Sequence, residues 1–250
     1  MTAAAIEAHG LVARFGGFLA NDDVSLVVRP GERRALIGPN GAGKSTLFNM
    51  LAGQLRPSAG SVALFGRPVT RMPAHQRARL GVARTFQITN LLSGLSVREN
   101  VQLTLAAESD ARRVFWRPLD RLQRLSGRAD EVLEQWGLAR YAGWPVSRLA
   151  YGQQRVLEIT LAMCRATKIL LLDEPTAGLA PADAGRLTSL VASLDRSVTI
   201  VFIEHDMEVA FGLADTVMVL QQGRVLAEGS PTEIASDERV LEAYLGGAHA

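Results

Sequence analysis

The sequence has a single cysteine, no long apolar run and almost no excess of one charge. Because Cys164 is the only cysteine, no disulfide can form within the chain, and we interpret it as a buried thiol. A membrane-spanning helix needs about 20 consecutive apolar residues. The longest apolar runs here, 169–172 and 198–203, have the length of strands. These absences exclude a disulfide scaffold and predict a chain that does not span a membrane.

The charge balance also limits the partners that we expect. The 250 residues include 27 Lys and Arg against 25 Asp and Glu, which gives a net charge of +2. A protein that binds nucleic acid usually carries a strongly basic face, so we expect no nucleic-acid partner. Residues 1–20 lack a basic segment ahead of an apolar core. This pattern predicts no secretory signal and a cytoplasmic location.

The first third of the chain has the pattern of short strands around one loop and one helix. Val24–Val28 and Arg33–Ile37 are typical of strands, and a glycine-rich loop follows the second. Apolar residues at three- and four-residue spacing after this loop predict a helix with one buried face. They are Leu47, Met50, Leu51 and Leu55.

The middle of the chain, roughly 88–150, is helical in pattern and rich in arginine, and we interpret it as an inserted helical lobe. Ser96–Glu99 has the S-x-x-E pattern of a helix-opening capping box, and Ser230–Glu233 repeats it before a predicted terminal helix. The arginines of the lobe favour a solvated face, with contact to anionic lipid or a permease as the alternative. They are Arg113, Arg117, Arg121, Arg124 and Arg128.

The second half alternates between strand and helix patterns. Residues 153–166 predict a helix ahead of the apolar strand Ile169–Leu172. A second helix, starting near Pro181, precedes the strand Val198–Ile203. This alternation predicts a parallel sheet with both faces covered. Residues 216–227 then have the pattern of a hairpin.

The strongest motif is a complete phosphate loop, G-x-x-x-x-G-K-[ST], between a predicted strand and a predicted helix. Its glycines let backbone N–H groups curl around phosphate oxygens, and the helix start adds the positive end of its dipole. In such a loop Lys44 reaches the β- and γ-phosphates, and the Ser45 hydroxyl ligates Mg²⁺. The candidate residues are Gly38, Pro39, Asn40, Gly41, Ala42, Gly43, Lys44, Ser45 and Thr46.

An apolar strand that ends in two acids supplies the partner that a phosphate loop requires. Asp173 follows Ile169–Leu172 directly and is predicted to hold the Mg²⁺ shell at the carboxyl end of the sheet. Glu174, one residue later, is suited to polarise an attacking water. The alternative, in which Asp173 only caps the turn before Pro175, is less favoured beside a phosphate loop.

A third segment indicates the class of nucleoside triphosphatase. A GTPase needs an [NT]-K-x-D motif, and the nearest match, Thr167–Leu170, lacks the aspartate. Leu149–Arg155 reads L-A-Y-G-Q-Q-R and lies at the start of a predicted helix. It resembles the L-S-G-G-Q signature segment of ABC-type ATPases.

Four further features match that family in order along the chain. Phe15 lies where the family has an aromatic residue that stacks on adenine, and Gln87 matches the glutamine that reaches Mg²⁺ and links the site to a membrane partner. Ala177–Pro181 occupies the position of the D-loop, and His205 that of the switch histidine, which contacts the γ-phosphate. The resemblance covers essentially the whole chain.

This resemblance implies one ABC-type ATP-binding domain over 1–250. The implied fold is α/β, a P-loop (RecA-like) core with an antiparallel β subdomain and an inserted α-helical subdomain at roughly 88–152. ATP and Mg²⁺ are the implied cofactors, and two subunits sandwich the ATP. The implied catalytic residues are Glu174, His205, Lys44 and Gln87, and the implied metal ligands are Ser45, Gln87 and Asp173. The segment that faces the γ-phosphate from the second subunit comprises Ala150, Tyr151, Gly152 and Gln153.

The chain departs from the family pattern at three positions. Ala150 replaces the signature serine, Tyr151 replaces a glycine, and Ala180 replaces the usual D-loop aspartate. We expect hydrolysis to survive, at a slower or more partner-dependent rate. A subunit that does not hydrolyse ATP is the alternative, and the intact Glu174 and His205 argue against it.

The form of the signature, with Phe15–Gly17 and Ala243–Gly246, resembles the ATP-binding subunits of branched-chain amino acid importers. The implied partners are two transmembrane permease subunits, a second ATPase subunit and, indirectly, a periplasmic solute-binding protein. The implied location is the cytoplasmic face of the inner membrane. Urea or amide importers and the lipopolysaccharide exporter ATPase are similar alternatives. A soluble ABC ATPase acting on DNA or ribosomes is a further one, disfavoured by the compact chain and near-neutral charge.

Overall fold

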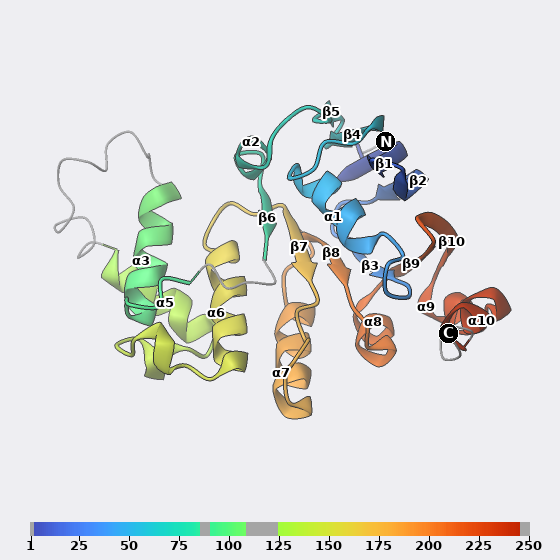
Figure 1. Ribbon diagram of the computed structural model, residues 1–250. Coiled ribbons are helices and arrows are strands. Elements are labelled where there is room, and N and C mark those ends of the chain that lie inside the picture. Colours follow the sequence, from blue (N-terminus) through green and yellow to red (C-terminus); the bar gives the residue numbers. More distant parts are fainter. Residues whose placement is uncertain (1–2, 86–90, 109–124, 246–250) are drawn as a thin grey trace. The chain divides into compact units, whose positions relative to one another are not determined.

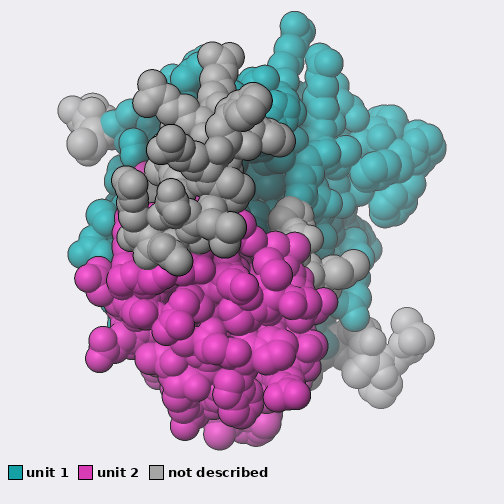
Figure 2. Space-filling model, turned by 90° about the vertical axis from the view of Figure 1, so that its left-hand side faces the viewer, with its two compact units in different colours: residues 1–84, 168–175, 192–250 teal, residues 85–167, 176–191 magenta. Residues whose placement is uncertain are grey.

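The computed structural model describes residues 3–85, 91–108 and 125–245, and the chain divides into two compact units that Figure 2 colours separately. Unit 1 contains Met1–Arg84, Lys168–Pro175 and Ala192–Ala250, and unit 2 contains Thr85–Thr167 and Thr176–Val191. Unit 2 takes in more of the chain than the predicted helical segment 88–152. The predicted site residue Gln87 and the arginines Arg113, Arg117, Arg121 and Arg124 lie outside the described residues.

Unit 1 contains two β-sheets (Figure 1). The smaller is antiparallel, with the strand order β2-β1-β4-β5. Its strands are β1 (Ile6–Phe15), β2 (Phe18–Val28), β4 (Ala59–Leu64) and β5 (Arg67–Pro68). After β2, the chain turns at Arg29–Gly31 and enters the second sheet, where the predicted strand Arg33–Ile37 forms.

The larger sheet has the order β10-β9-β3-β8-β7-β6 and is parallel apart from the β9–β10 hairpin. Its strands are β3 (Arg33–Ile37), β6 (Val82–Arg84), β7 (Ile169–Asp173), β8 (Thr199–Ile203), β9 (Thr216–Gln221) and β10 (Arg224–Gly229). Every residue of β3, β7 and β8 is buried, as expected of strands covered on both faces. The predicted parallel sheet and terminal hairpin are therefore confirmed.

Helix α1 (Lys44–Ala52) connects the two sheets through one apolar core. Leu47 and Phe48 are fully buried there among residues of both sheets. Gly53, with a φ of 78°, ends the helix in the left-handed conformation that favours glycine. The prediction that Leu55 lies on this helix is therefore wrong, and Leu55 packs against the core from the following segment.

The remaining helices of unit 1 are short. They are α2 (Ala74–Ala78), α8 (Met207–Leu213), α9 (Pro231–Ala235) and α10 (Glu238–Leu245). The capping box that opens α9 is confirmed, since the Ser230 N–H donates to Glu233 Oε2 at 2.7 Å. The single predicted terminal helix is two helices, because α9 ends at Ala235 and Asp237 opens α10 by accepting from the Arg239 N–H.

Unit 2 is helical. Its elements are α3 (Val97–Glu108), α5 (Ser126–Gln135), α6 (Tyr151–Met163), α7 (Pro181–Ala192, whose last residue belongs to unit 1) and the 3₁₀ turns Ala139–Tyr141 and Val146–Arg148. The predicted capping box of α3 is confirmed, with the Ser96 N–H donating to Glu99 Oε2 at 2.7 Å. Within residues 3–85, 91–108 and 125–245, no helix is long and apolar enough to cross a membrane.

The boundaries of α6 differ from the prediction of 153–166. The helix begins at Tyr151, because the Gln153 side chain accepts from the Ala150 N–H and so caps the first turn. It ends at Met163. The Thr167 hydroxyl donates to the Ala162 carbonyl at 2.7 Å, which is one of the last carbonyl groups without a partner inside the helix.

Candidate functional site

Two glycines of the phosphate loop hold conformations and contacts that other residues could not. Gly38 has a φ of 143°, and a Cβ there would lie 2.1 Å from the Leu220 carbonyl oxygen of β9. Gly43 has a φ of 96°, and its Cβ would lie 2.4 Å from the Ala20 carbonyl oxygen of β2. Backbone packed this closely cannot move aside cheaply. The loop between β3 and α1 is therefore held in shape by two neighbouring strands.

Lys44 is buried at the start of α1 and turns its ammonium group back onto the loop. Its Nζ donates to the Gly38 carbonyl at 2.6 Å and to the Pro39 carbonyl at 2.9 Å. Burial lowers the pKa of Lys44, while the carboxylates of Glu174 and Asp173 act in the opposite direction. A buried cation beside a ring of backbone amides is suited to hold an anion such as a phosphate.

Asp173 and Glu174 lie where β7 ends. Asp173 is 5% exposed, and its Oδ2 accepts from Arg84 Nη2 at 2.8 Å. Its Oδ1 is buried without a hydrogen-bond partner in the described part of the chain. Glu174 has a φ of 47°, and its N–H donates to the Ile203 carbonyl at 3.0 Å. The two neighbouring acids therefore have different surroundings.

Glu174 and His205 come together because β7 and β8 are parallel neighbours whose carboxyl ends share one edge. Glu174 Oε1 lies 2.6 Å from His205 Nε2, and the His205 side chain is 45% exposed. The next strand, β3, pairs with β8 and leads into the phosphate loop. Unit 1 therefore assembles Lys44, Asp173, Glu174 and His205 at one sheet edge.

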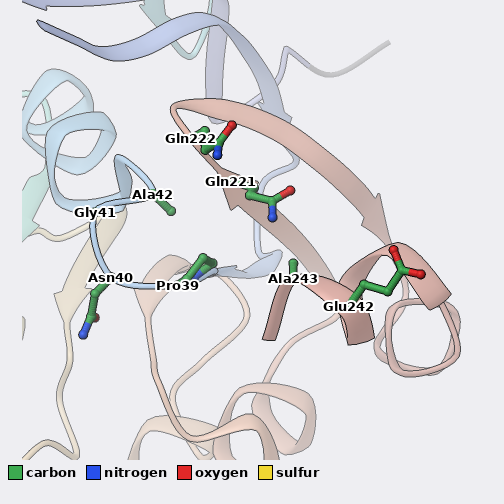
Figure 3. A pocket seen from close by; sticks show the side chains of 8 residues that line it. All are labelled: Pro39, Asn40, Gly41, Ala42, Gln221, Gln222, Glu242 and Ala243. Carbon is green, nitrogen blue, oxygen red and sulfur yellow. The ribbon is translucent and has the colours of Figure 1, made fainter. Parts of the chain in front are cut away.

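A pocket of about 430 Å³ lies beside the phosphate loop (Figure 3). The residues that line it come from the phosphate loop, the β9–β10 turn and α10, and they are Pro39, Asn40, Gly41, Ala42, Gln221, Gln222, Glu242 and Ala243. The last four were not among the predicted site residues. The parallel pairing of β9 with β3 brings Gln221 and Gln222 to the loop, but nothing in the local sequence marks α10 as its neighbour.

The C-terminal helix also contacts the start of the loop. Tyr244 of α10 is largely buried, and this burial raises the pKa of its phenol. The nearby Gly38 backbone N–H lowers the same pKa and so acts in the opposite direction. Helix α10 is therefore part of the wall around the phosphate loop.

Phe15 lies at the end of β1, before the turn into β2. Its side chain is 51% exposed, which is unusual for a phenylalanine because a large apolar ring gains free energy on burial. Phe18, just after the turn, is also exposed. This tip of the antiparallel sheet therefore offers aromatic faces to a partner or ligand.

The signature segment belongs to unit 2 and begins α6. Ala150 is the N-cap, and it can form only half of a capping box because alanine has no side-chain acceptor. Gln153 also donates from Nε2 to the Tyr141 hydroxyl at 2.7 Å. Tyr151 is 43% exposed, and the Arg155 guanidinium lies 5.1 Å from its ring centroid.

Gly152 is confined by the first turn of α7. A Cβ at Gly152 would lie 3.1 Å from Asp183 Cγ, so even alanine would push this carboxylate aside. The preceding D-loop segment, Ala177–Pro181, lies in the same unit, and a Cβ at Gly178 would lie 3.5 Å from Cε1 of the Tyr151 ring. Unit 2 thus packs its signature and D-loop segments together.

The geometry of unit 1 suits phosphoryl transfer to water. A cradle of glycine backbone and a buried lysine can hold phosphates, while a carboxylate paired with a histidine can orient and deprotonate water. The carboxyl edge of a parallel sheet is where such ligands bind in α/β folds.

Comparison with known proteins agrees with this chemistry. Residues 21–177 match the family described as ABC transporter, and residues 224–250 match the family described as branched-chain amino acid ATP-binding cassette transporter. The high-affinity branched-chain amino acid transport ATP-binding protein LivG of Salmonella typhimurium is 42% identical, over 96% of this chain and 97% of LivG. BraF of Pseudomonas aeruginosa, described in the same words, is 39% identical over 97% and 98%.

Solved structures share the fold over nearly the whole length. An ATP-binding cassette of an ABC transporter in its ADP conformation superposes with a TM-score of 0.85 at 29% identity, over 98% of this chain and 99% of that one. A dimeric cassette in a post-hydrolysis state with ADP and phosphate gives a TM-score of 0.75 at 25% identity, over 90% and 98%. The predicted α/β P-loop fold is confirmed, and the chain belongs to the ABC transporter family as one of its ATP-hydrolysing cassettes.

Proposed function

We propose that this chain powers an importer for branched-chain or related amino acids. The observation that carries this assignment is the near-full-length similarity to LivG and BraF, together with the match of residues 224–250 to the branched-chain family. Two transmembrane permease subunits hold the chain at the cytoplasmic face of the inner membrane, and a periplasmic protein delivers the solute. Nucleic acid has no part in this function, in line with the near-neutral charge.

The roles of the site residues follow from their chemistry. Residues 38–46 wrap the phosphates of ATP, and Lys44 leaves its two carbonyl partners for the β- and γ-phosphates. Phe15 stacks on the adenine, for which its exposed ring is suited. Glu174 orients and deprotonates the attacking water, and His205 contacts the γ-phosphate.

The donor set fits a magnesium ion. Ser45 is exposed on the first turn of α1, and the buried Asp173 Oδ1 has no partner in the described part of the chain. Hydroxyl and carboxylate oxygens are the ligands that this hard cation prefers. Ser45 and Asp173 hold Mg²⁺ and its waters, with Gln87 as a further ligand. The ion supplies charge neutralisation for the phosphates.

The catalytic site is completed by a second ATPase subunit. Ala150, Tyr151, Gly152 and Gln153 of the second subunit offer backbone N–H groups and the start of a helix to the γ-phosphate. The dimeric cassette with ADP and phosphate supports this arrangement as a similar protein. Because Ala150 has no hydroxyl, the missing hydrogen bond costs on the order of 1–3 kcal/mol. We propose that 1–250 act as one ATP-binding domain, in which the helical part is a subdomain.

Two measurements test this function. The tagged chain is isolated from gently solubilised native membranes, and the accompanying proteins are identified. Two permease-type proteins and a second ATPase support the importer, whereas ribosomal or DNA-repair proteins without a permease contradict it. Deletion of the chain separates the alternatives: loss of urea or amide uptake identifies one of those importers, and loss of lipopolysaccharide export identifies the exporter. In the isolated complex, Glu174→Gln abolishes ATP turnover while nucleotide binding persists, and equal turnover in both proteins contradicts the assigned role of Glu174.

A further inference from the structure

Arg84 is a mostly buried cation at a point where the sequence shows only an ordinary strand residue. It is the last residue of β6, and its side chain is 10% exposed. Its Nη2 donates to Asp173 Oδ2 at 2.8 Å, and its Nη1 donates to Asn49 Oδ1 at 2.6 Å and to Gln54 Oε1. Its guanidinium carbon also lies 5.2 Å from the Phe48 ring centroid. The guanidinium is therefore fixed from several directions.

The partners of Arg84 come from two elements of the candidate site. Phe48 and Asn49 belong to α1, the helix that begins with Lys44 and Ser45, and Gln54 follows its end. Asp173 ends β7, which pairs with β6. Arg84 thus links the helix that carries the phosphate-loop lysine to the strand that carries the acidic pair. A planar fork of N–H donors suits this task better than the single ammonium group of lysine.

The two oxygens of Asp173 are used differently. Oδ2 accepts from Arg84, whereas Oδ1 is buried and has no partner within the described residues. A buried acceptor without a partner costs free energy, so its presence at a sheet edge points to a ligand that is yet to bind. Outer hydrogen bonds to a metal-ligating carboxylate fix its orientation, and losing one typically weakens metal binding 10- to 100-fold.

We propose that Arg84 is a positioning residue for the magnesium site. It holds Asp173 by Oδ2 and thereby presents Oδ1 to Mg²⁺ or its bound waters. This inference rests on the proposed function, because it takes Asp173 as a residue of the Mg²⁺ shell. The alternative is that Arg84 competes with Mg²⁺ as a second cation on the same carboxylate. The two alternatives predict opposite responses to removal of the arginine.

The test measures nucleotide binding without turnover. All variants carry Glu174→Gln, and a fluorescent ATP analogue is titrated at increasing free Mg²⁺ and, separately, with EDTA. We expect Arg84→Met to raise about tenfold the Mg²⁺ concentration at which nucleotide binding is half-maximally strengthened. The nucleotide affinity measured in EDTA is expected to stay unchanged. Arg84→Lys, which keeps the charge but loses the fork, is expected to give a smaller rise.

A matched control separates positioning from general stability. Arg34 is also a buried, ion-paired arginine, but it lies at the beginning of β3 and binds Glu32 and Glu228. Arg34→Met is expected to lower the unfolding temperature and to leave the Mg²⁺ titration unchanged. If Arg84→Met does not fold, Asn49→Ala removes one anchor of the guanidinium and is expected to shift the Mg²⁺ requirement in the same direction.

The outcomes are distinct. An unchanged or lower Mg²⁺ requirement in the Arg84 variants overturns the positioning role, and a lower one identifies the arginine as a competitor. An equal shift in Arg34→Met also overturns it, since the effect is then one of stability. If Mg²⁺ does not alter nucleotide binding even with Arg84 intact, the magnesium assignment of Ser45 and Asp173 fails first, and the role of Arg84 fails with it.

Discussion

Glu174 combines a catalytic side chain with a backbone conformation that opposes folding. Its φ of 47° lies in the left-handed region. That conformation costs a residue with a Cβ about 1–2 kcal/mol, but costs glycine almost nothing. Replacing Glu174 by glycine or by alanine removes the same carboxylate and the same 2.6 Å contact to His205. The difference in stability between the two variants therefore isolates the backbone strain.

The expected magnitude follows from two opposing effects. Glycine at this position avoids about 1–2 kcal/mol of strain, and it loses about 0.5–1 kcal/mol through the larger entropy of its unfolded chain. We expect Glu174→Gly to be more stable than Glu174→Ala by roughly 0.5–1 kcal/mol, the reverse of the usual order. Denaturant unfolding of the two variants measures this difference, provided that the unfolding free energy of both depends on denaturant concentration with the same slope.

Gly185 supplies the control. It lies inside α7 without a left-handed φ, and a Cβ there would meet nothing within 4 Å, so Gly185→Ala is expected to stabilise the protein by up to about 1 kcal/mol. If Glu174→Ala is as stable as Glu174→Gly while Gly185→Ala behaves as expected, the strain argument is refuted. Both Glu174 variants are expected to lose ATP turnover, so strain and catalysis are measured at one residue.

Four further substitutions, one of them a control, test other parts of the site. Gly38→Ala places a Cβ 2.1 Å from the Leu220 carbonyl and is expected to cost about 3 kcal/mol or more in denaturant unfolding. Gly41→Ala, which meets nothing within 4 Å, is expected to cost only about 1 kcal/mol, and equal losses would contradict the clash. Ala150→Ser supplies the missing N-cap acceptor of α6 and is expected to stabilise the protein by about 1 kcal/mol. It is also expected to raise ATP turnover. A less stable variant would contradict the capping argument. Phe15→Ala is expected to weaken nucleotide binding about tenfold, since one stacked base is worth about 1–3 kcal/mol, and unchanged affinity would remove Phe15 from the site.

Much of the fold could be predicted because its signals are local. The buried strand Ile169–Asp173 is an apolar run up to its last residue, and Arg33–Ile37 is apolar after its two arginines, since both faces of these strands are covered. The capping boxes at Ser96 and Ser230 place a hydroxyl and a carboxylate three residues apart, so each can be found from four letters of sequence. The phosphate loop is likewise contiguous.

What could not be predicted depends on residues far apart in the sequence. The hydrogen bond from Arg84 to Asp173 joins residues 89 positions apart, and no sequence pattern around either residue predicts it. The contact of α10 with the phosphate loop could not be predicted for the same reason. It joins residues about 200 positions apart, and it depends on where the β9–β10 hairpin directs the chain that follows it. The end of α1 was missed for a different reason: apolar spacing continues to Leu55, but the left-handed Gly53 stops the helix first.

The order of the strands explains why the chemistry concentrates at one edge. The neighbours β3, β8, β7 and β6 are all parallel, so their carboxyl ends meet there. Each end contributes one part: the phosphate loop, His205, the pair Asp173 and Glu174, and Arg84. The strand interiors need only be apolar and buried, whereas the residues at and just after the end of each strand set the chemistry. A one-residue slip of β7 against β8 would therefore separate Glu174 from His205 while leaving an equally apolar core, which makes the register of this pair a requirement of function.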